Sequence, residues 1–505
     1  MTFASVMQTD RDRTRVLGNS GEFLRSGRIT RMNDQRVQVW DESREHYGEW
    51  WVGHEKETKF TGFLEFENRA PRLTVISGAI GQQVFNLAHA ILVHGELESG
   101  TKVTLWDMAG HSLEFLSTDD DSMRHARRFS YAISGEHLTG PDQAKFRYSA
   151  YQLHGLGTWS AKDDPVPFNL DEKLLPQYAP AELAISDEEE TGVTYSVKVY
   201  IENFRRLESS SRTRTGAIIN YPGTDAQVVF ESEPAAPARI HDLLLFDLQA
   251  LLTFSYQGGA PIIREWLAVE DRAQQLDVIR KDSFTGTRPR GHVFRQAMVL
   301  SLARTEPNVL LPAWWRVVEE LYPATQVVSL YHHGTRGILE SSVASAIAVA
   351  EHMHSLIGPT RTRFEGGFLE SHVPSIKAAF PGKDHAPFRE FLYEALKNNR
   401  PTLTTRLKEL VAAVTEPRLM LMTIRPDQWI ADVKRVRNPV AHTSSHVTRR
   451  GGDSSTLLYR VNSQTRAIVT LLVLQQMGLD PAALDDAAEA LSREIRHFND
   501  DQHKE

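Results

Sequence analysis

Residues 91–108, ILVHGELESGTKVTLWDM, contain two runs of β-branched and aromatic residues, 91–97 and 102–108, around a short polar stretch with a glycine. Runs of this kind recur along the first half of the chain, and several alternate apolar and polar residues with period 2, as half-buried antiparallel strands do. The others are RVQVW (36–40), FTGFLEF (60–66), RLTVISG (72–78) and YSVKVYI (195–201). Regular strands separated by turns predict an antiparallel β-rich domain, sandwich or barrel-like.

After residue 240 the apolar residues recur mostly at helical spacing. The segment EPAAPAR (233–239), with two prolines and small residues, is the best candidate for a linker. Helices are predicted at 241–254 and 261–279, and then at 338–357, 385–398, 406–416, 429–436, 461–477 and 481–498. We therefore expect an α+β chain: a β-rich domain (1–232), a helical connector (240–320) and an all-α bundle (321–505).

The composition excludes several classes of protein. The 505 residues include no cysteine, which rules out a disulfide scaffold, cysteine-ligated zinc, iron–sulfur centres and cysteine nucleophiles. The apolar stretches are too short for a bilayer, which needs about 20 residues, and the charged start MTFASVMQTDRDRTR does not resemble a signal peptide. A cytoplasmic protein that does not contact membrane is therefore expected.

Charge is distributed unevenly between the two halves of the chain. Residues 301–505 carry 24 Lys and Arg against 23 Asp and Glu, whereas residues 1–300 carry 33 against 42. The second half is therefore the better place for a polyanionic substrate. Its near-zero net charge argues against an extended electrostatic grip on nucleic acid and for a local phosphate pocket.

The segment VKRVRNPVAHTSSH contains the residues best suited to chemistry, in the string R-N-P-x-x-H from Arg437 to His442. Asn is a preferred N-cap and Pro a preferred first helical residue, so a helix is predicted to restart at Asn438 and Pro439. That would place His442 in a first turn, where exposed N–H groups and the positive end of the dipole attract phosphate.

These residue types suit metal-independent RNA cleavage, with no cofactor. A histidine near its ordinary pKa can move the protons of the 2′-hydroxyl or the leaving oxygen, and an arginine can neutralise charge on the phosphorus oxygens. Asn438 could orient the phosphate or ribose. One histidine cannot be acid and base together, which makes a symmetric dimer with two apposed sites attractive. Taken alone, however, R-x4-H also fits an arginine at a helix break with a packed or solvated histidine nearby.

The string RNPVAH, late in a helical region, resembles the R-x(4–6)-H signature of HEPN ribonucleases. AVAEHMH (348–354) is similar to a helix of the ApeA-like HEPN subgroup. GFLEF (62–66), 91–107, ISGEHL (133–138) and LHGLGTW (153–159) resemble the ApeA N-terminal β domain. The resemblance implies an anti-phage abortive-infection RNase that cuts host RNA, with tRNA as the expected class. It also implies a HEPN homodimer. We further expect the β domain to be a sensing or regulatory module, with a phage-derived protein as a candidate trigger.

Carried over by position, the resemblance implies catalytic roles for Arg437, Asn438 and His442, and an acidic partner role for Glu351. The neighbouring cations are expected to contact substrate; they are Lys434, Arg435, Arg449 and Arg450. Arg449 and Arg450 lie in the Ser/Gly-rich stretch 444–455, for which an ordinary solvated loop is the alternative.

Other interpretations of the helical half stay open. Glu351 and His354 share a helix face and could be a satisfied core pair. Together with Glu494 and His497 they form half of a di-iron carboxylate pattern, for which Glu340 and Glu409 could be proposed as the missing ligands. A non-catalytic module that dimerises and binds RNA or nucleotide, with a protein-binding β domain, is the main rival function.

Overall fold

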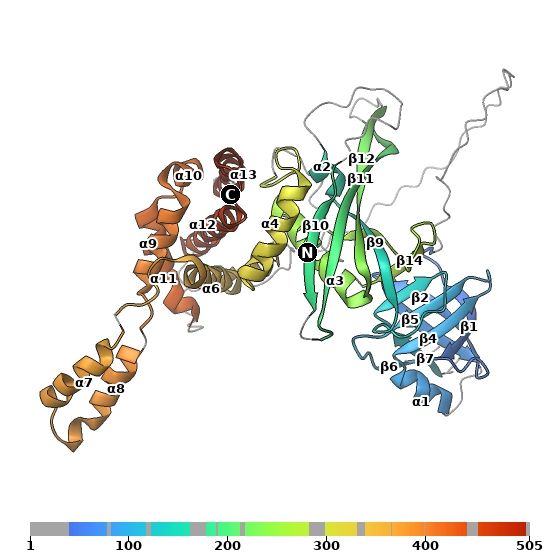
Figure 1. Cartoon of the computed structure of the whole chain (residues 1–505), viewed down its shortest axis with the longest axis horizontal. Coiled ribbons are helices and arrows are strands. Elements are labelled where there is room, and N and C mark those ends of the chain that lie inside the picture. The colour runs from blue at the N-terminus through green and yellow to red at the C-terminus, as the bar shows by residue number, and fades with distance from the viewer. Residues whose placement is uncertain are drawn as a thin grey trace, which may run out of the picture. The chain divides into compact units, whose positions relative to one another are not determined.

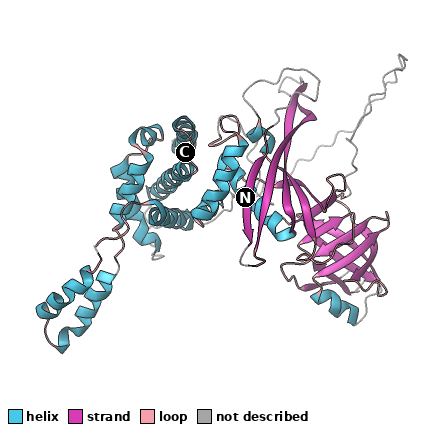
Figure 2. Cartoon of the chain, in the orientation of Figure 1, coloured by secondary structure: helices cyan, strands magenta, loops and turns pink. Residues whose placement is uncertain are grey.

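A computed structural model describes residues 40–77, 82–117, 123–161, 178–187, 190–212, 218–281, 298–330, 339–364, 366–397, 399–441 and 453–500. Strands prevail between His46 and Arg280, and helices alone follow from Pro307 onward in the described residues (Figure 2). The predicted α+β order is therefore confirmed. The run 36–40 lies outside the described residues except for Trp40.

The strands form one 14-stranded antiparallel sheet of order β10-β11-β12-β9-β13-β14-β8-β5-β4-β1-β2-β3-β7-β6 (Figure 1). Among the described strands β10 and β6 have one neighbour each, so the sheet is not a closed barrel. The strands are β1 (His46–Val52), β2 (Phe60–Glu67), β3 (Ala70–Ser77), β4 (Leu92–Leu97), β5 (Lys102–Trp106), β6 (Leu113–Ser117), β7 (Met123–Arg128), β8 (Tyr131–Ser134), β9 (Lys145–Leu153), β10 (Ala181–Asp187), β11 (Val193–Arg212), β12 (Ile218–Pro237), β13 (Ile262–Ala268) and β14 (Leu276–Arg280). Two short helices, α1 (Gln82–His89) and α2 (Leu156–Ser160), interrupt them.

The hairpin of β4 and β5 confirms the strand prediction for residues 91–108. Its register pairs Glu96 with Lys102 across the two strands, an opposite-charge pair that favours this alignment. The ring of Trp50 lies against Gly95, where a Cβ atom would come within 2.2 Å of it. Trp50 and Trp106 are fully buried, so these side chains anchor the core.

Residues 233–239 are not a linker, so this prediction is wrong. β12 continues to Pro237, and α3 (Ala238–Tyr256) begins at the next residue. The pairing of β12 with β9 shifts register between Glu231 and Ala236. Proline cannot donate to a strand ladder and is tolerated at such an irregularity. The prolines here therefore mark an irregular strand end and the start of α3.

The helix predicted at 261–279 is also wrong, because this segment forms β13 and β14. The segment contains the charged residue Glu265, and Arg280 follows it directly. In the structure they form a buried ion pair of 2.9 Å between the two strands. The sheet region thus extends to Arg280, past the predicted boundary at 232, and residues 240–320 are not a purely helical connector.

The helices after the sheet are α4 (Pro307–Glu320), α5 (Ala324–Leu330), α6 (Leu339–Ile357), α7 (Phe368–Ala379), the 3₁₀ helix η3 (Lys383–His385), α8 (Ala386–Lys397), α9 (Leu403–Val414), α10 (Glu416–Leu421), α11 (Pro426–Ala441), α12 (Asp453–Gln476) and α13 (Pro481–Asp500). The long helices α6, α12 and α13 confirm the predictions made from apolar spacing. None of the described helices has the length and hydropathy needed to cross a bilayer.

Helix α12 lies at the centre of the bundle and packs against α6, α9, α11 and α13. The Nε1–H of Trp429, on α11, donates to Thr465 Oγ1 on α12 at 3.0 Å within this core. The indole therefore fixes the rotation of α11 as well as its distance from α12. This rotation determines which way the charged end of α11 faces.

Helices α7 and α8, which follow α6 and precede α9 along the chain, form a hairpin and pack on each other (Figure 1). Asn399 joins the two ends of the hairpin: its side chain accepts from Phe364 N at 2.6 Å and donates to Phe364 O at 2.9 Å. No described residue of α8 is buried, and Phe391 is 66% exposed. The hairpin therefore adds little to the core of the bundle.

We expect Phe391→Ser to change the free energy of unfolding by less than about 0.5 kcal/mol, because the ring is largely in water already. Val414→Ala, at a fully buried position of α9, should cost about 2 kcal/mol. Urea unfolding monitored by circular dichroism compares the two variants. A cost for Phe391→Ser as large as that for Val414→Ala would show that the hairpin is part of the core.

Candidate functional site

Helix α11, which carries the start of the R-N-P-x-x-H string, runs without interruption from Pro426 to Ala441. The prediction that a helix restarts at Asn438 and Pro439 is therefore wrong. Arg437 lies near the C-terminal end of α11, where the helix dipole is partially negative and favours a cation. The argument that a helix start attracts phosphate at this point no longer applies, because α11 ends at Ala441 instead of a helix starting at Pro439.

The packing of α11 explains why its helix passes the proline. Trp429, Val433 and Val436 recur at helical spacing and are buried, so the bundle core holds the helix up to the motif. Pro439 lies in the last turn, where its missing N–H removes a single backbone hydrogen bond. Tertiary packing thus outweighs the local preference of Asn-Pro for a helix start.

Three of the predicted site residues lie outside the described residues: His442, Arg449 and Arg450. The side chain of Asn438 is outside the described part as well. The geometry of the site therefore rests on Arg437 and the residues around it.

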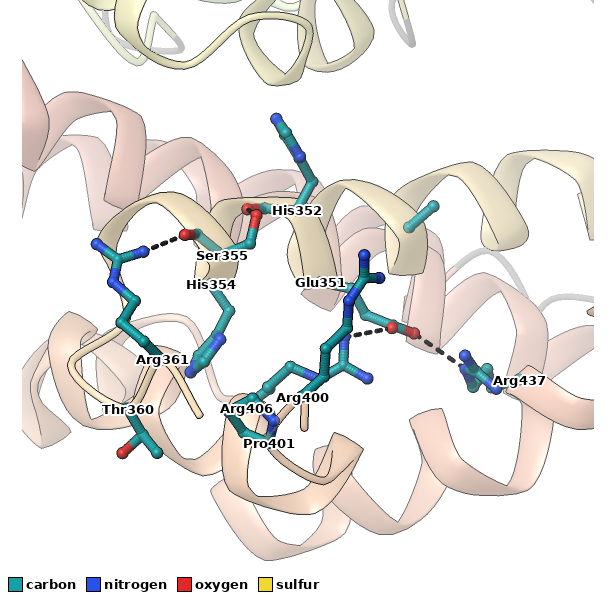
Figure 3. A pocket seen from close by; sticks show the side chains of 11 residues that line it. Glu351, His352, His354, Ser355, Thr360, Arg361, Arg400, Pro401, Arg406 and Arg437 are labelled. Carbon is teal, nitrogen blue, oxygen red and sulfur yellow. Dashed lines mark hydrogen bonds and ion pairs between the residues drawn. The ribbon is translucent and has the colours of Figure 1, made fainter. Parts of the chain in front are cut away.

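Glu351, on α6, bridges two arginines from two other helices (Figure 3). Its Oε1 lies 2.9 Å from Nε of Arg437 on α11, and its Oε2 lies 2.6 Å from Nη1 of Arg406 on α9. Glu351 and Arg406 are mostly buried, whereas the side chain of Arg437 is 42% exposed. The bridge uses Nε of Arg437 and holds an exposed guanidinium group in place.

These side chains line a cavity of about 520 Å³, to which Arg361 and Arg400 also contribute. A cavity of this volume can hold a ligand larger than a single phosphate. Four arginines thus face it, against the one carboxylate of Glu351. Arg400 is exposed and has no ion-pair partner among the described residues. The excess of positive charge makes the cavity an anion site, and forked guanidinium groups suit phosphate oxygens.

A second carboxylate, Glu409 on α9, supports one wall of the cavity. It lies 2.6 Å from Nε2 of His354 and accepts a hydrogen bond of 2.5 Å from the Thr360 hydroxyl. Burial alone would raise the pKa of Glu409, but the hydrogen bonds from Thr360 and His354 hold that pKa below its usual value. Glu409 is therefore an ionised acceptor that joins α6, α9 and the segment after α6.

Arg361 closes the C-terminal end of α6. Its guanidinium donates to the carbonyl of Ser355 (Figure 3) and to the carbonyl of Leu356. A cation at this position compensates the free carbonyls and the negative dipole end of the helix. An anion in the cavity is therefore not repelled by the end of α6.

The other predicted substrate contacts on α11, Lys434 and Arg435, are both exposed. At 100° per residue, Lys434 lies about 60° around the helix from Arg437 and Arg435 about 160° from it. Neither lines the cavity. Lys434 is thus placed to extend the basic surface beside Arg437, whereas Arg435 faces away from it.

Two family models match the chain. The description of one is ApeA N-terminal domain 1, over residues 45–291, and that of the other is Apea-like HEPN, over residues 366–482. The chain belongs to the ApeA-like HEPN family. The HEPN match contains Arg406 and Arg437, and begins after Glu351. No curated protein and no solved structure matched this ApeA-like HEPN protein.

Three arginines of the ApeA-like HEPN site were missed in the sequence: Arg361, Arg400 and Arg406. Arg361 and Arg400 are far apart in the chain, and the α7–α8 hairpin brings its two ends together through the contacts of Asn399. No local motif marks them. The one available signal is the pair of amphipathic helices at 368–397, which predicts a hairpin with neighbouring ends.

The arrangement of the ApeA-like HEPN site disfavours the di-iron alternative. Glu351 faces two guanidinium groups instead of other carboxylates, and Glu409 is held by His354 and Thr360. No group of three or more metal-ligating side chains occurs among the described residues. The Glu351 and His354 side chains are therefore arranged around ion pairs, not around a shared metal.

Proposed function

We propose that this protein is an endoribonuclease of anti-phage defence that cleaves RNA at the arginine-lined cavity of its HEPN domain. The observation that carries the proposal is the ion pair of 2.9 Å between Arg437 and Glu351 in a cavity with three further arginines. This ion pair supports the proposal that Arg437, the arginine of the R-x4-H motif, holds the phosphodiester. Host RNA, and tRNA in particular, is the proposed substrate.

The proposed reaction is a transesterification. The ribose 2′-oxygen loses its proton and attacks the phosphorus, and the bond from phosphorus to the 5′-oxygen breaks. Arg437 stabilises the negative charge that develops on the phosphorus oxygens. His442 moves a proton as acid or base, and Asn438 orients the phosphate or ribose. The products are a 2′,3′-cyclic phosphate and a 5′-hydroxyl, and no step requires a metal ion.

Two further elements belong to the proposal. A homodimer through the HEPN domain is expected from the family resemblance. The β-rich domain, which contains the 14-stranded sheet, is proposed to sense the trigger that activates the nuclease, with a phage-derived protein as the candidate.

The decisive experiment incubates the purified full-length protein with total tRNA in EDTA, beside His442→Ala, and maps the cleaved ends. We expect cleavage by the wild type alone, with 2′,3′-cyclic phosphate ends. If RNA stays intact, the assay is repeated with extract of infected cells. RNA that binds but stays intact there too would support the binding-module alternative, above all if Arg437→Ala weakens binding more than His442→Ala does.

Glu351→Gln should lower the rate of cleavage roughly 10- to 100-fold, because the neutral amide no longer holds Arg437 at its place. RNA affinity should stay equal or rise, since the cavity loses its one negative charge. Single-turnover rates and filter binding separate the two effects. Glu416→Gln, at an exposed position of α10, is the control. A parallel loss of rate and affinity would argue against this positioning role.

A further inference from the structure

Two histidines of α6, His352 and His354, line the cavity. His354 follows Glu351 by three residues on α6, so both side chains leave the same face of the helix with about 4.5 Å of axial rise between them. A phosphate held by Arg437 beside Glu351 would thus lie within about one helical turn of the imidazole. His354 is 2% exposed and contributes to the cavity wall.

The orientation of this imidazole is set by its neighbours. An ionised Glu409 can only accept, so the Nε2–H of His354 donates to it at 2.6 Å. The Thr360 hydroxyl and backbone N–H fix the same carboxylate. Gly358 lies against the Nε2 edge of the ring, where a Cβ atom would come within 2.5 Å. Nδ1 has no hydrogen-bond partner in the part of the chain that the structure describes.

We propose that His354 is a catalytic residue, the general acid that protonates the leaving 5′-oxygen through Nδ1, and that Glu409 is its positioning residue. The inference rests on the proposed function and deepens it. The hydrogen bond from Nε2–H to the Glu409 carboxylate fixes the tautomer and the orientation of the ring, as a carboxylate behind a catalytic histidine does.

The protons and bonds of this step balance. With His354 as the acid, His442 acts as the base and takes the 2′-hydroxyl proton as the 2′-oxygen bonds to phosphorus. The bond from phosphorus to the 5′-oxygen breaks with its electron pair on that oxygen. The Nδ1 proton of His354 then completes the 5′-hydroxyl. His354 thus supplies the acid of the step, and His442 supplies the base.

The test uses the purified full-length protein and two oligonucleotides of equal sequence, one with an ordinary cleavage site and one with sulfur in place of its 5′-bridging oxygen. A thiol has a pKa of about 8.5, so a thiolate departs without general-acid help. His354→Gln should lose about 100-fold or more on the oxygen substrate and stay within about threefold of wild type on the sulfur substrate. Glu409→Gln should show the same selective loss, but smaller.

His372→Gln is the matched control, because His372 is an exposed histidine of α7 that does not line the cavity and is bonded through Nδ1 to the carbonyl of Phe368. It should leave both rates unchanged. Equal losses on both substrates for His354→Gln and Glu409→Gln would overturn the inference and leave them a structural role. If wild type cleaves neither substrate, even with its trigger, the proposed nuclease function itself fails.

Discussion

Arg437→Ala is expected to lower the rate of RNA cleavage about 1,000-fold while leaving the fold intact. The guanidinium of Arg437 is the one exposed member of the bridge with Glu351 and Arg406, and transition-state charge held by one arginine accounts for effects of this size. Stability should change by less than about 1 kcal/mol, since a half-exposed ion pair contributes little and Glu351 keeps its bond to Arg406. Single-turnover cleavage and urea unfolding measure the two quantities.

Two variants sharpen this prediction. Arg437→Lys keeps the charge but loses the planar fork, so it should recover part of the rate and not all of it. Arg425→Ala removes an exposed arginine at the other end of α11, about 18 Å away along the helix, and should cleave at the wild-type rate. Wild-type activity in Arg437→Ala would remove Arg437 from the catalytic machinery.

Asp247→Asn should stabilise the protein at alkaline pH by up to about 4 kcal/mol. Asp247 lies on α3 with 4% of its surface exposed, and burial raises its pKa from 3.8 to about 7. A raised pKa means that the folded state holds the proton more tightly than the unfolded state does. The contribution of this group to stability is therefore greatest at acid pH and is lost as the pH rises through about 7.

The measurement compares urea unfolding of wild type and Asp247→Asn at pH 5 and pH 8. The advantage of the variant at pH 5 should be less than half of that at pH 8, because the buried carboxyl is still protonated there. Asp142→Asn, at an exposed turn position, should show no such pH dependence. An advantage for Asp247→Asn that does not grow with pH would contradict the raised pKa.

Segments in which the spacing of apolar residues places them all on one buried face were predicted well. Residues 195–201, in β11, alternate buried and more exposed side chains with period 2, and α6 and α12 carry apolar residues at helical spacing. Their pattern can be read locally because burial of one face decides each structure. The α+β order followed from such segments, and Arg437 and Glu351 became candidate site residues through the R-x4-H motif and the family resemblance.

Segments whose structure depends on a distant partner were predicted poorly. Residues 262–280 became two strands because β9 and β8 offer pairing edges and because Glu265 and Arg280 neutralise each other inside the sheet. Residues 426–441 stayed one helix because the core retains the apolar face of α11. In both cases long-range contacts outweighed local preferences of about 1 kcal/mol per residue.

By itself, the sequence determined the α+β order, most of the helices and strands, and the family resemblance, since these depend on patterns within about 20 neighbouring residues. Only the tertiary structure decided that Glu351 bridges Arg406 and Arg437 and that His354 rests on Glu409. It also decided that the ends of the hairpin bring Arg361 and Arg400 to the same cavity. The physical reason is that an ion pair requires proximity in space, and the residues that meet here are 50 to 90 positions apart in the chain.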